Sequence, residues 1–170
     1  MLTACTMPFT FGKPADDQTI TPLVELKSQT IDPLPEKSAY DQKVMAFITD
    51  IEMIDGKRHV TIDPVNWLNG DAAVQAKIKD HECPDPKSCL PNGFYIENSS
   101  HQTQEIILPY KTPIQRSTDF RSDSPNGKRM MVFEDFINWY QSNTELFQHM
   151  PFNFYLKGNT AVHIVEQYVP

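Results

Sequence analysis

The sequence contains little glycine, no long apolar run and no cluster of basic residues. Only 6 of its 170 residues are glycine, whereas 14 are proline. Proline interrupts helices because it lacks a backbone N–H, so a long helical bundle is disfavoured. No stretch of the sequence approaches the ~18 apolar residues that a membrane-spanning helix needs, and we therefore expect no such helix.

Positive charge is scarce and scattered along the chain. Lys and Arg number 15 against 22 Asp and Glu, so the formal net charge is −7. Nucleic-acid binding needs clustered Lys and Arg to contact the phosphates, so we expect no nucleic-acid partner. Hydrophobic residues make up 39% of the chain and aromatic residues 11%, which is enough for a folded core.

The common catalytic signatures are also missing. The sequence has no Gly-x-Ser-x-Gly elbow, no glycine-rich phosphate loop and no dinucleotide fingerprint. We therefore expect no cofactor and favour a protein without catalytic residues. The alternative is a small exported hydrolase, in which Glu97 together with Glu105 or Glu166 would divide the acid and base roles if the fold brings two of them together.

The first residues carry a possible lipidation motif. Leu2, two small residues and Cys5 match the lipobox of bacterial lipoproteins, in which the cysteine becomes the lipidated N-terminus. The segment that follows contains five prolines with polar residues between them, which is typical of an extended tether. We therefore divide the chain into the lipobox and tether over 1–36 and one globular domain over 37–170. Within the tether, residues 24–26 could instead form a short edge strand.

Two further cysteines lie close together. Cys83 and Cys89 flank a short loop with two prolines, and an exported protein sits in an oxidising compartment, where such a pair forms a disulfide. A metal site that includes His81 is the alternative. Zinc needs three or four ligands with tighter cysteine spacing, so we expect the disulfide and no metal.

A second group of possible metal ligands crowds the segment from 63 to 71. Calcium prefers oxygen ligands, but the spacing here does not match the Asp-x-Asp-x-Asp-Gly loop. Turn and helix-capping roles explain these residues better than a metal site does. The residues are Asp63, Asn66, Asn69 and Asp71.

Alternation of apolar and polar residues predicts two β-hairpins. The segments 43–54 and 59–63 flank Asp55 and Gly56, which supply the positive φ of a tight turn. The segments 152–156 and 160–168 flank a second turn that contains Gly158. Further strands are expected over 94–98, 104–109 and 112–115.

Two short helices are expected between the strands. One runs from 71 to about 80 with Asp71 as its N-cap, and the other over 133–142, where apolar residues recur at helical spacing. The fold class is therefore α+β and mostly β. We expect a small antiparallel sheet or an oligonucleotide/oligosaccharide-binding (OB)-like barrel with two short helices, preceded by the extended Pro-rich tether.

Some residues could contribute to a binding surface. Aromatic side chains that are exposed together can stack on a sugar or peptide, although core packing accounts for most of them. Polar groups near the C-terminus could be presented at the end of a sheet. The candidates are Trp67, Tyr95, Glu166 and Tyr168.

Several blocks of the sequence resemble an uncharacterised group of small exported bacterial proteins, many of which are lipoproteins. The blocks are the hairpin around Asp55, the segments 67–72 and 90–98, and the ending 151–170. The resemblance implies export and a shared fold, but no activity and no site residues. We expect a lipid-anchored protein of the cell envelope, facing the periplasm or on the cell surface, that binds an envelope protein, a glycan or the cell wall, or that assists assembly.

Overall fold

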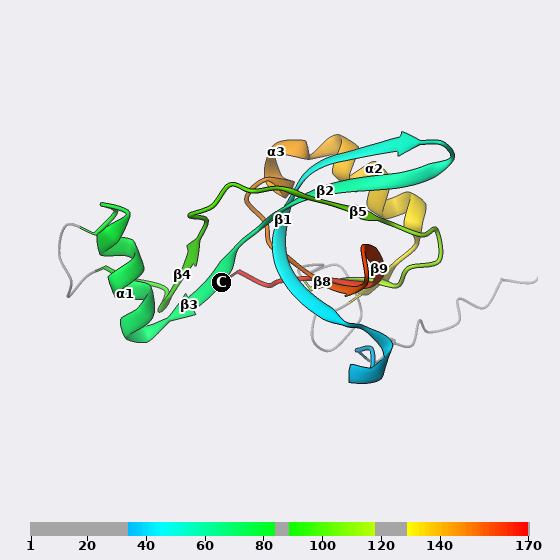
Figure 1. Cartoon of the computed structure of the whole chain (residues 1–170). Helices are drawn as coiled ribbons and strands as arrows, with labels where there is room; N and C mark the ends of the chain where they lie inside the picture. Colours follow the sequence, from blue (N-terminus) through cyan, green and yellow to red (C-terminus); the bar gives the residue numbers. More distant parts are fainter. Residues whose placement is uncertain (1–33, 84–88, 118–128, 170) are drawn as a thin grey trace, which may run out of the picture.

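The computed structural model describes residues 34–83, 89–117 and 129–169. Its centre is a closed barrel of five strands, and two of them form the long curved hairpin seen in Figure 1. The barrel strands are β1 (Gln42–Ile54), β2 (Lys57–Pro64), β5 (Gln104–Ile107), β8 (Phe152–Lys157) and β9 (Thr160–Glu166).

The long strand β1 links two halves of the barrel. Its C-terminal half pairs with β2 and its N-terminal half with β8, both antiparallel, with a register shift between Ile48 and Asp50. A bulge of this kind bends a strand, which lets β1 serve two neighbours. The barrel closes where β5 and β9 run parallel, with Ile107 opposite Thr160.

The order of the strands around the barrel defines its type. Numbered one to five in chain order, the barrel strands are β1, β2, β5, β8 and β9. Around the ring they follow the order one, two, three, five, four and back to one, because the third strand, β5, pairs with the fifth, β9. This Greek-key order is that of an OB-type barrel. The OB-like barrel is therefore confirmed in preference to an open antiparallel sheet.

Two helices between β5 and β8 supply much of the core. They are α2 (Phe133–Ser142), which was predicted, and the four-residue α3 (Thr144–Phe147), which was not. The α2 face predicted to be apolar is buried. Phe136, Phe147 and Phe152 are all 0% exposed, so rings from both helices and from β8 meet in one cluster.

A separate lobe is inserted between β2 and β5 (Figure 1). It contains β3 (Asn66–Asn69), α1 (Gly70–Lys79) and β4 (Phe94–Glu97), and β3 pairs antiparallel with β4. The N-cap of α1 is Asn69, so the prediction of Asp71 as the cap is wrong. Asp71 lies instead in the first turn, where its negative charge still suits the positive end of the helix dipole.

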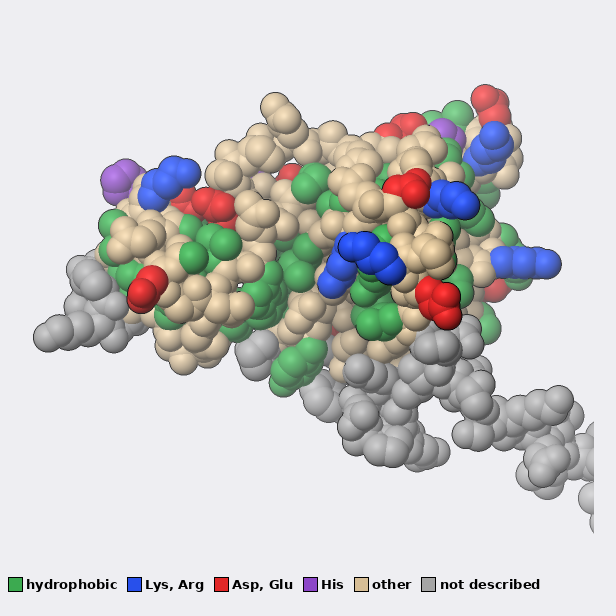
Figure 2. All heavy atoms as spheres, turned by 60° about the horizontal axis from the view of Figure 1, so that its bottom comes forward, with side chains coloured by type: hydrophobic (Ala, Val, Ile, Leu, Met, Phe, Trp, Pro, Cys, Tyr) green, Lys and Arg blue, Asp and Glu red, His purple; other side chains and the backbone are tan. Residues whose placement is uncertain are grey.

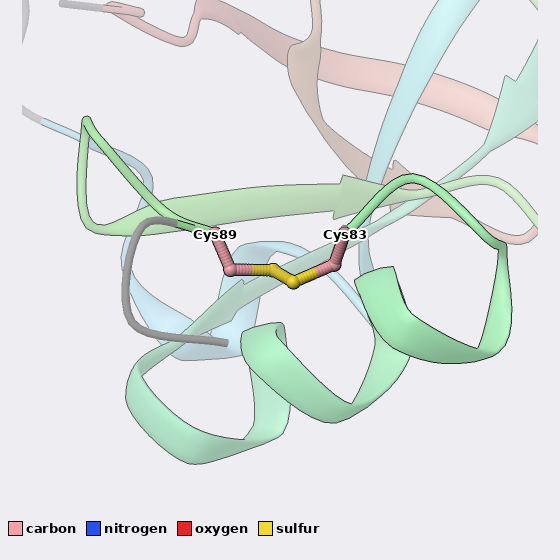
Figure 3. Close-up of a disulfide and its surroundings, with 2 residues drawn as sticks. All are labelled: Cys83 and Cys89. Carbon is pink, nitrogen blue, oxygen red and sulfur yellow. A yellow bond between two sulfur atoms is a disulfide. The ribbon is translucent and has the colours of Figure 1, made fainter. Parts of the chain in front are cut away.

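The predicted disulfide between Cys83 and Cys89 is confirmed, and it lies in this lobe. Figure 3 shows the bridge beside α1, where it joins the end of the helix to the chain that leads to β4. The Cα atoms are 5.2 Å apart and six positions separate the two residues. Closing so short a loop contributes roughly 2 kcal/mol through the lowered entropy of the unfolded chain, so the bridge stabilises the lobe locally.

The remaining elements are short. A 3-10 helix, η1 (Lys37–Ala39), precedes β1, and the hairpin of β6 (Ile114–Arg116) and β7 (Arg129–Met131) extends the sheet beyond β9. Cys5 and the predicted tether up to residue 33 lie outside the described residues. Among the described helices, none is both long and apolar enough to cross a membrane.

Surface charge on the face in Figure 2 is mixed. Acidic and basic side chains are scattered among hydrophobic ones, and neither sign of charge covers a continuous field. The mixed pattern on this face agrees with the scattered basic residues of the sequence.

Candidate functional site

The candidate site is a groove where the β1–β2 turn, the chain that leaves β5 and the start of α2 come together. We call it the turn groove. Its volume is ≈ 370 Å³, which is in the range of small binding sites. Apolar side chains form most of its walls. The lining residues are Met53, Gly56, Lys57, Arg58, Ile107, Leu108, Pro109, Tyr110, Phe133 and Glu134.

The tight turn between β1 and β2 shapes one end of the groove. Asp55 and Gly56 have φ values of 49° and 73°, and two successive residues with positive φ form the type of turn that joins twisted antiparallel strands. The turn keeps the strand ends in register and sets Met53 opposite Arg58. The Met53 side chain is 56% exposed, so a flexible apolar group lies at the rim of the groove.

Two aromatic rings and one arginine form the floor and the other rim. The Arg58 guanidinium lies 4.9 Å from the centre of the buried Phe133 ring, a contact that orients its charge. Tyr110 packs at 5.1 Å against the same Phe133 ring, yet it is 63% exposed. The groove therefore offers an exposed aromatic surface beside a positive charge.

A hydrogen bond holds Tyr110 in place. Its hydroxyl donates to the carboxylate of Glu134 in the first turn of α2. This bond raises the pKa of Tyr110 and lowers the pKa of Glu134, and the charge of Arg58 also lowers the pKa of Glu134. Glu134 is therefore negatively charged near neutral pH and Tyr110 stays neutral, so the charge of Glu134 is already engaged within the groove.

The aromatic candidates from the sequence lie in the inserted lobe, away from the residues that line the groove. Trp67 stacks on Phe94 with ring centres 4.2 Å apart and donates to Asn69. The Tyr95 hydroxyl donates to Asp80 over 2.8 Å, and burial, followed by this bond, raises the pKa of Tyr95. Both rings are half-buried and make contacts that hold the lobe together.

The two C-terminal candidates differ in exposure. Tyr168 is 47% exposed, whereas Glu166 is 1% exposed. The Glu166 carboxylate accepts a hydrogen bond from the backbone N–H of Ser117 over 2.8 Å, and Arg116 Nε lies 3.8 Å from it. Glu166 thus anchors the chain that leaves β6 and is not presented at the surface.

The carboxylates of the hydrolase alternative belong to different strands and have different partners. Glu97 accepts from Asn66 over 3.1 Å, and Glu105 lies 2.9 Å from the ring nitrogen Nδ1 of His59. The fully buried Glu166 is bound to a backbone N–H. Within the described residues, no hydrogen bond or ion pair joins any two of these three carboxylates through a shared partner.

Three of the four residues considered as calcium ligands form hydrogen bonds with other side chains. Asp63 accepts from Asn98 over 2.6 Å, Asn66 donates to Glu97, and Asn69 accepts from Trp67. In the described part of the chain, no group of three or more His, Cys, Asp or Glu could hold a metal ion.

Sequence reasoning missed the turn groove because its walls come from three separated segments. One signal was present. Met53 and Ile54 are consecutive apolar residues next to a hairpin turn, a place where polar residues dominate. Both are exposed, as expected of apolar residues that belong to a binding surface and not to the core.

The fold and the groove together define an OB-type barrel protein with a disulfide-bonded insertion. No family model, no curated protein and no solved structure matches the chain.

Proposed function

We propose that this protein is an exported, lipid-anchored protein of the cell envelope whose barrel binds another protein through the turn groove, without catalysis. The observation that carries the proposal is the open apolar groove with exposed Met53 and Tyr110 at its rims. Val132, next to the groove residue Phe133, is also 52% exposed. Neighbouring exposed apolar side chains of this kind mark interaction sites in many proteins.

The position of the groove supports a binding role. OB-type barrels bind ligands on the face of their second and third strands and on the loops beside it. In this barrel those strands are β2 and β5, and Arg58 and Ile107 from them line the groove together with the β1–β2 turn. The groove thus lies at the end of the strands that OB-type barrels use for recognition.

The chemistry of the groove indicates a protein partner. Aliphatic side chains and two aromatic rings form most of its walls, and few polar groups converge there to orient a polar ligand such as a glycan. Lys57 and Arg58 place two positive charges against the single carboxylate of Glu134, which Tyr110 already engages. In a chain of net charge −7, this local excess of positive charge favours a partner segment that presents an apolar side chain next to a carboxylate.

The proposal for the compartment rests on the cysteines. A disulfide persists in an oxidising environment such as the periplasm, and Cys83 and Cys89 form one. The lipobox around Cys5 and the Pro-rich segment behind it support anchoring to a membrane by acyl chains, with the barrel held away from the lipid surface. Stable anchoring takes two such chains, because one chain alone binds only weakly.

The intact mass of the protein from its native cells tests the anchoring. Free thiols are first alkylated under denaturing, non-reducing conditions. We expect loss of the residues before Cys5, added acyl groups and no alkylation of Cys83 or Cys89. An N-terminus without acyl groups, together with three alkylated thiols, would overturn both the anchor and the oxidising compartment.

Peptide binding tests the groove separately. Purified protein is applied to an array of octapeptides with varied central residues. We expect the bound peptides to be enriched in aliphatic residues that neighbour Asp or Glu. The variant Met53→Asp places a carboxylate at the apolar rim and should weaken binding about tenfold, which corresponds to ~1.4 kcal/mol.

The control for this experiment is Val169→Asp, which adds the same charge at an exposed position, 38% exposed, that does not line the groove. It should leave peptide binding and the melting temperature unchanged. A set of bound peptides without acidic enrichment, or equal binding by Met53→Asp and Val169→Asp, would contradict the proposed partner chemistry.

A further inference from the structure

A second pocket lies between the β6–β7 hairpin and α2, on elements that extend beyond the barrel. We call it the arginine pocket. Its volume is ≈ 310 Å³, and no described residue lines both this pocket and the turn groove. The lining residues are Arg116, Arg129, Met131, Asp135, Asn138 and Trp139.

The register of the hairpin brings two positive charges together. Arg116 on β6 lies directly opposite Arg129 on β7. Side chains at facing positions of an antiparallel pair have Cβ atoms about 5 Å apart, and like charges at such positions destabilise the pairing. Two facing arginines therefore need negative charge nearby, from the protein or from a ligand.

Arg116 is oriented by an aromatic ring and lies beside a buried carboxylate. Its guanidinium lies 4.1 Å from the centre of the Trp139 ring, which holds the group in one plane. Its Nε lies 3.8 Å from Glu166 Oε2, an oxygen that already accepts the Ser117 N–H. Within the described residues this buried Nε has no hydrogen-bond partner. The guanidinium is therefore oriented and lies beside a carboxylate, but its Nε makes no direct hydrogen bond to a described residue.

Arg129 forms a weak ion pair with Asp135. The two side chains are 3.4 Å apart and are 45% and 49% exposed. An exposed pair of this kind contributes about 0–1 kcal/mol, so the pairing with Asp135 by itself does not keep a ligand oxyanion from the guanidinium. The lining of the pocket carries two guanidinium groups and one carboxylate, the Glu166 carboxylate lies 3.8 Å from Arg116 Nε, and the side chain of the exposed Asn138 adds an amide.

We propose that the arginine pocket binds a small ligand through its carboxylate or phosphate group, held between Arg116 and Arg129. The planar guanidinium group pairs with either oxyanion through two parallel N–H···O bonds. Stacking on Trp139 pre-orients one of the two groups, which reduces the entropy that binding costs. This site is independent of the turn groove, so either proposal can fail while the other holds.

Fluorescence of Trp139 reports on binding because Arg116 lies against its ring. The background variant Trp67→Phe removes the other tryptophan of the chain. Inorganic phosphate and propionate are titrated separately into this full-length protein at constant ionic strength, adjusted with chloride. We expect a saturable change with at least one of the two anions, and the stronger response identifies the preferred oxyanion.

Two variants and one matched control localise the effect. Arg116→Gln and Arg129→Gln should each weaken binding at least about tenfold. Lys157→Gln removes the same charge from an exposed position at the β8–β9 turn and should bind like the background protein. Arg129→Gln keeps the test valid if Arg116→Gln fails to fold, because Arg129 is exposed.

Three results would overturn the site. They are a response to both anions that does not saturate, a response that chloride alone reproduces, and equal binding by Arg129→Gln and Lys157→Gln. Saturable binding that both arginine substitutions weaken would support it, and the choice between phosphate and propionate would define the ligand group.

Discussion

Replacing Phe152 with alanine is expected to lower the free energy of unfolding by about 3–5 kcal/mol. Phe152 is 0% exposed and lies at the start of β8, where helix and barrel rings meet. Its ring centre is 5.3 Å from that of Phe147 and 6.2 Å from those of Phe136 and Trp139. The substitution leaves a cavity that this close-packed aromatic cluster can fill only in part, which adds to the lost burial energy.

Unfolding in urea, followed by fluorescence, measures this loss. The control is Leu146→Ala in α3, because Leu146 is 47% exposed and its truncation should cost less than about 1 kcal/mol. A loss below about 1 kcal/mol for Phe152→Ala would show that the contact between α2, α3 and β8 is not central to stability. It would also weaken both site proposals, since α2 supplies residues to each pocket.

Replacing Glu166 with glutamine is expected to cost about 1.5–3 kcal/mol, the range for a hydrogen bond to a charged group. The Glu166 side chain is 0% exposed, accepts the Ser117 N–H and lies 3.8 Å from Arg116 Nε. Glutamine keeps the shape but loses the negative charge. Arg116 then faces Arg129 without its nearby carboxylate, and the repulsion between the two arginines adds to the cost.

Urea unfolding also measures this effect, with Glu105→Gln as the matched control. The Glu105 side chain is 55% exposed and pairs with His59 over 2.9 Å, and such pairs contribute at most about 1 kcal/mol. Equal losses for Glu166→Gln and Glu105→Gln would show that burial of the Glu166 carboxylate does not stabilise the fold. The larger loss expected for Glu166→Gln would assign it a structural role in the sheet.

Local patterns carried the correct predictions. The hairpin turn at Asp55 and Gly56, the second hairpin around Gly158, and the helix over 133–142 are confirmed. Each rests on residues that are close in sequence, so turn geometry and side-chain periodicity decide the outcome. The disulfide is confirmed for the same reason, because six positions separate Cys83 from Cys89.

Weak local signals explain the errors. Asn69, and not Asp71, occupies the N-cap position of α1, since either residue type suits a helix start and only the path of the chain from β3 decides between them. The four-residue α3 and the three-residue β7 are too short for a periodicity to be recognised. They form because neighbouring elements support them, as the burial of Phe147 against the aromatic cluster shows.

The sequence by itself determined the turns, the two ten-residue helices, the disulfide and the α+β class, because these depend on neighbours along the chain. Only the tertiary structure decided how the barrel closes, through the parallel pairing of Ile107 with Thr160. It also decided that Glu166 is buried and that Arg116 faces Arg129. Both pockets arise in the same way, since contacts between distant segments depend on strand register and packing, which no local pattern encodes.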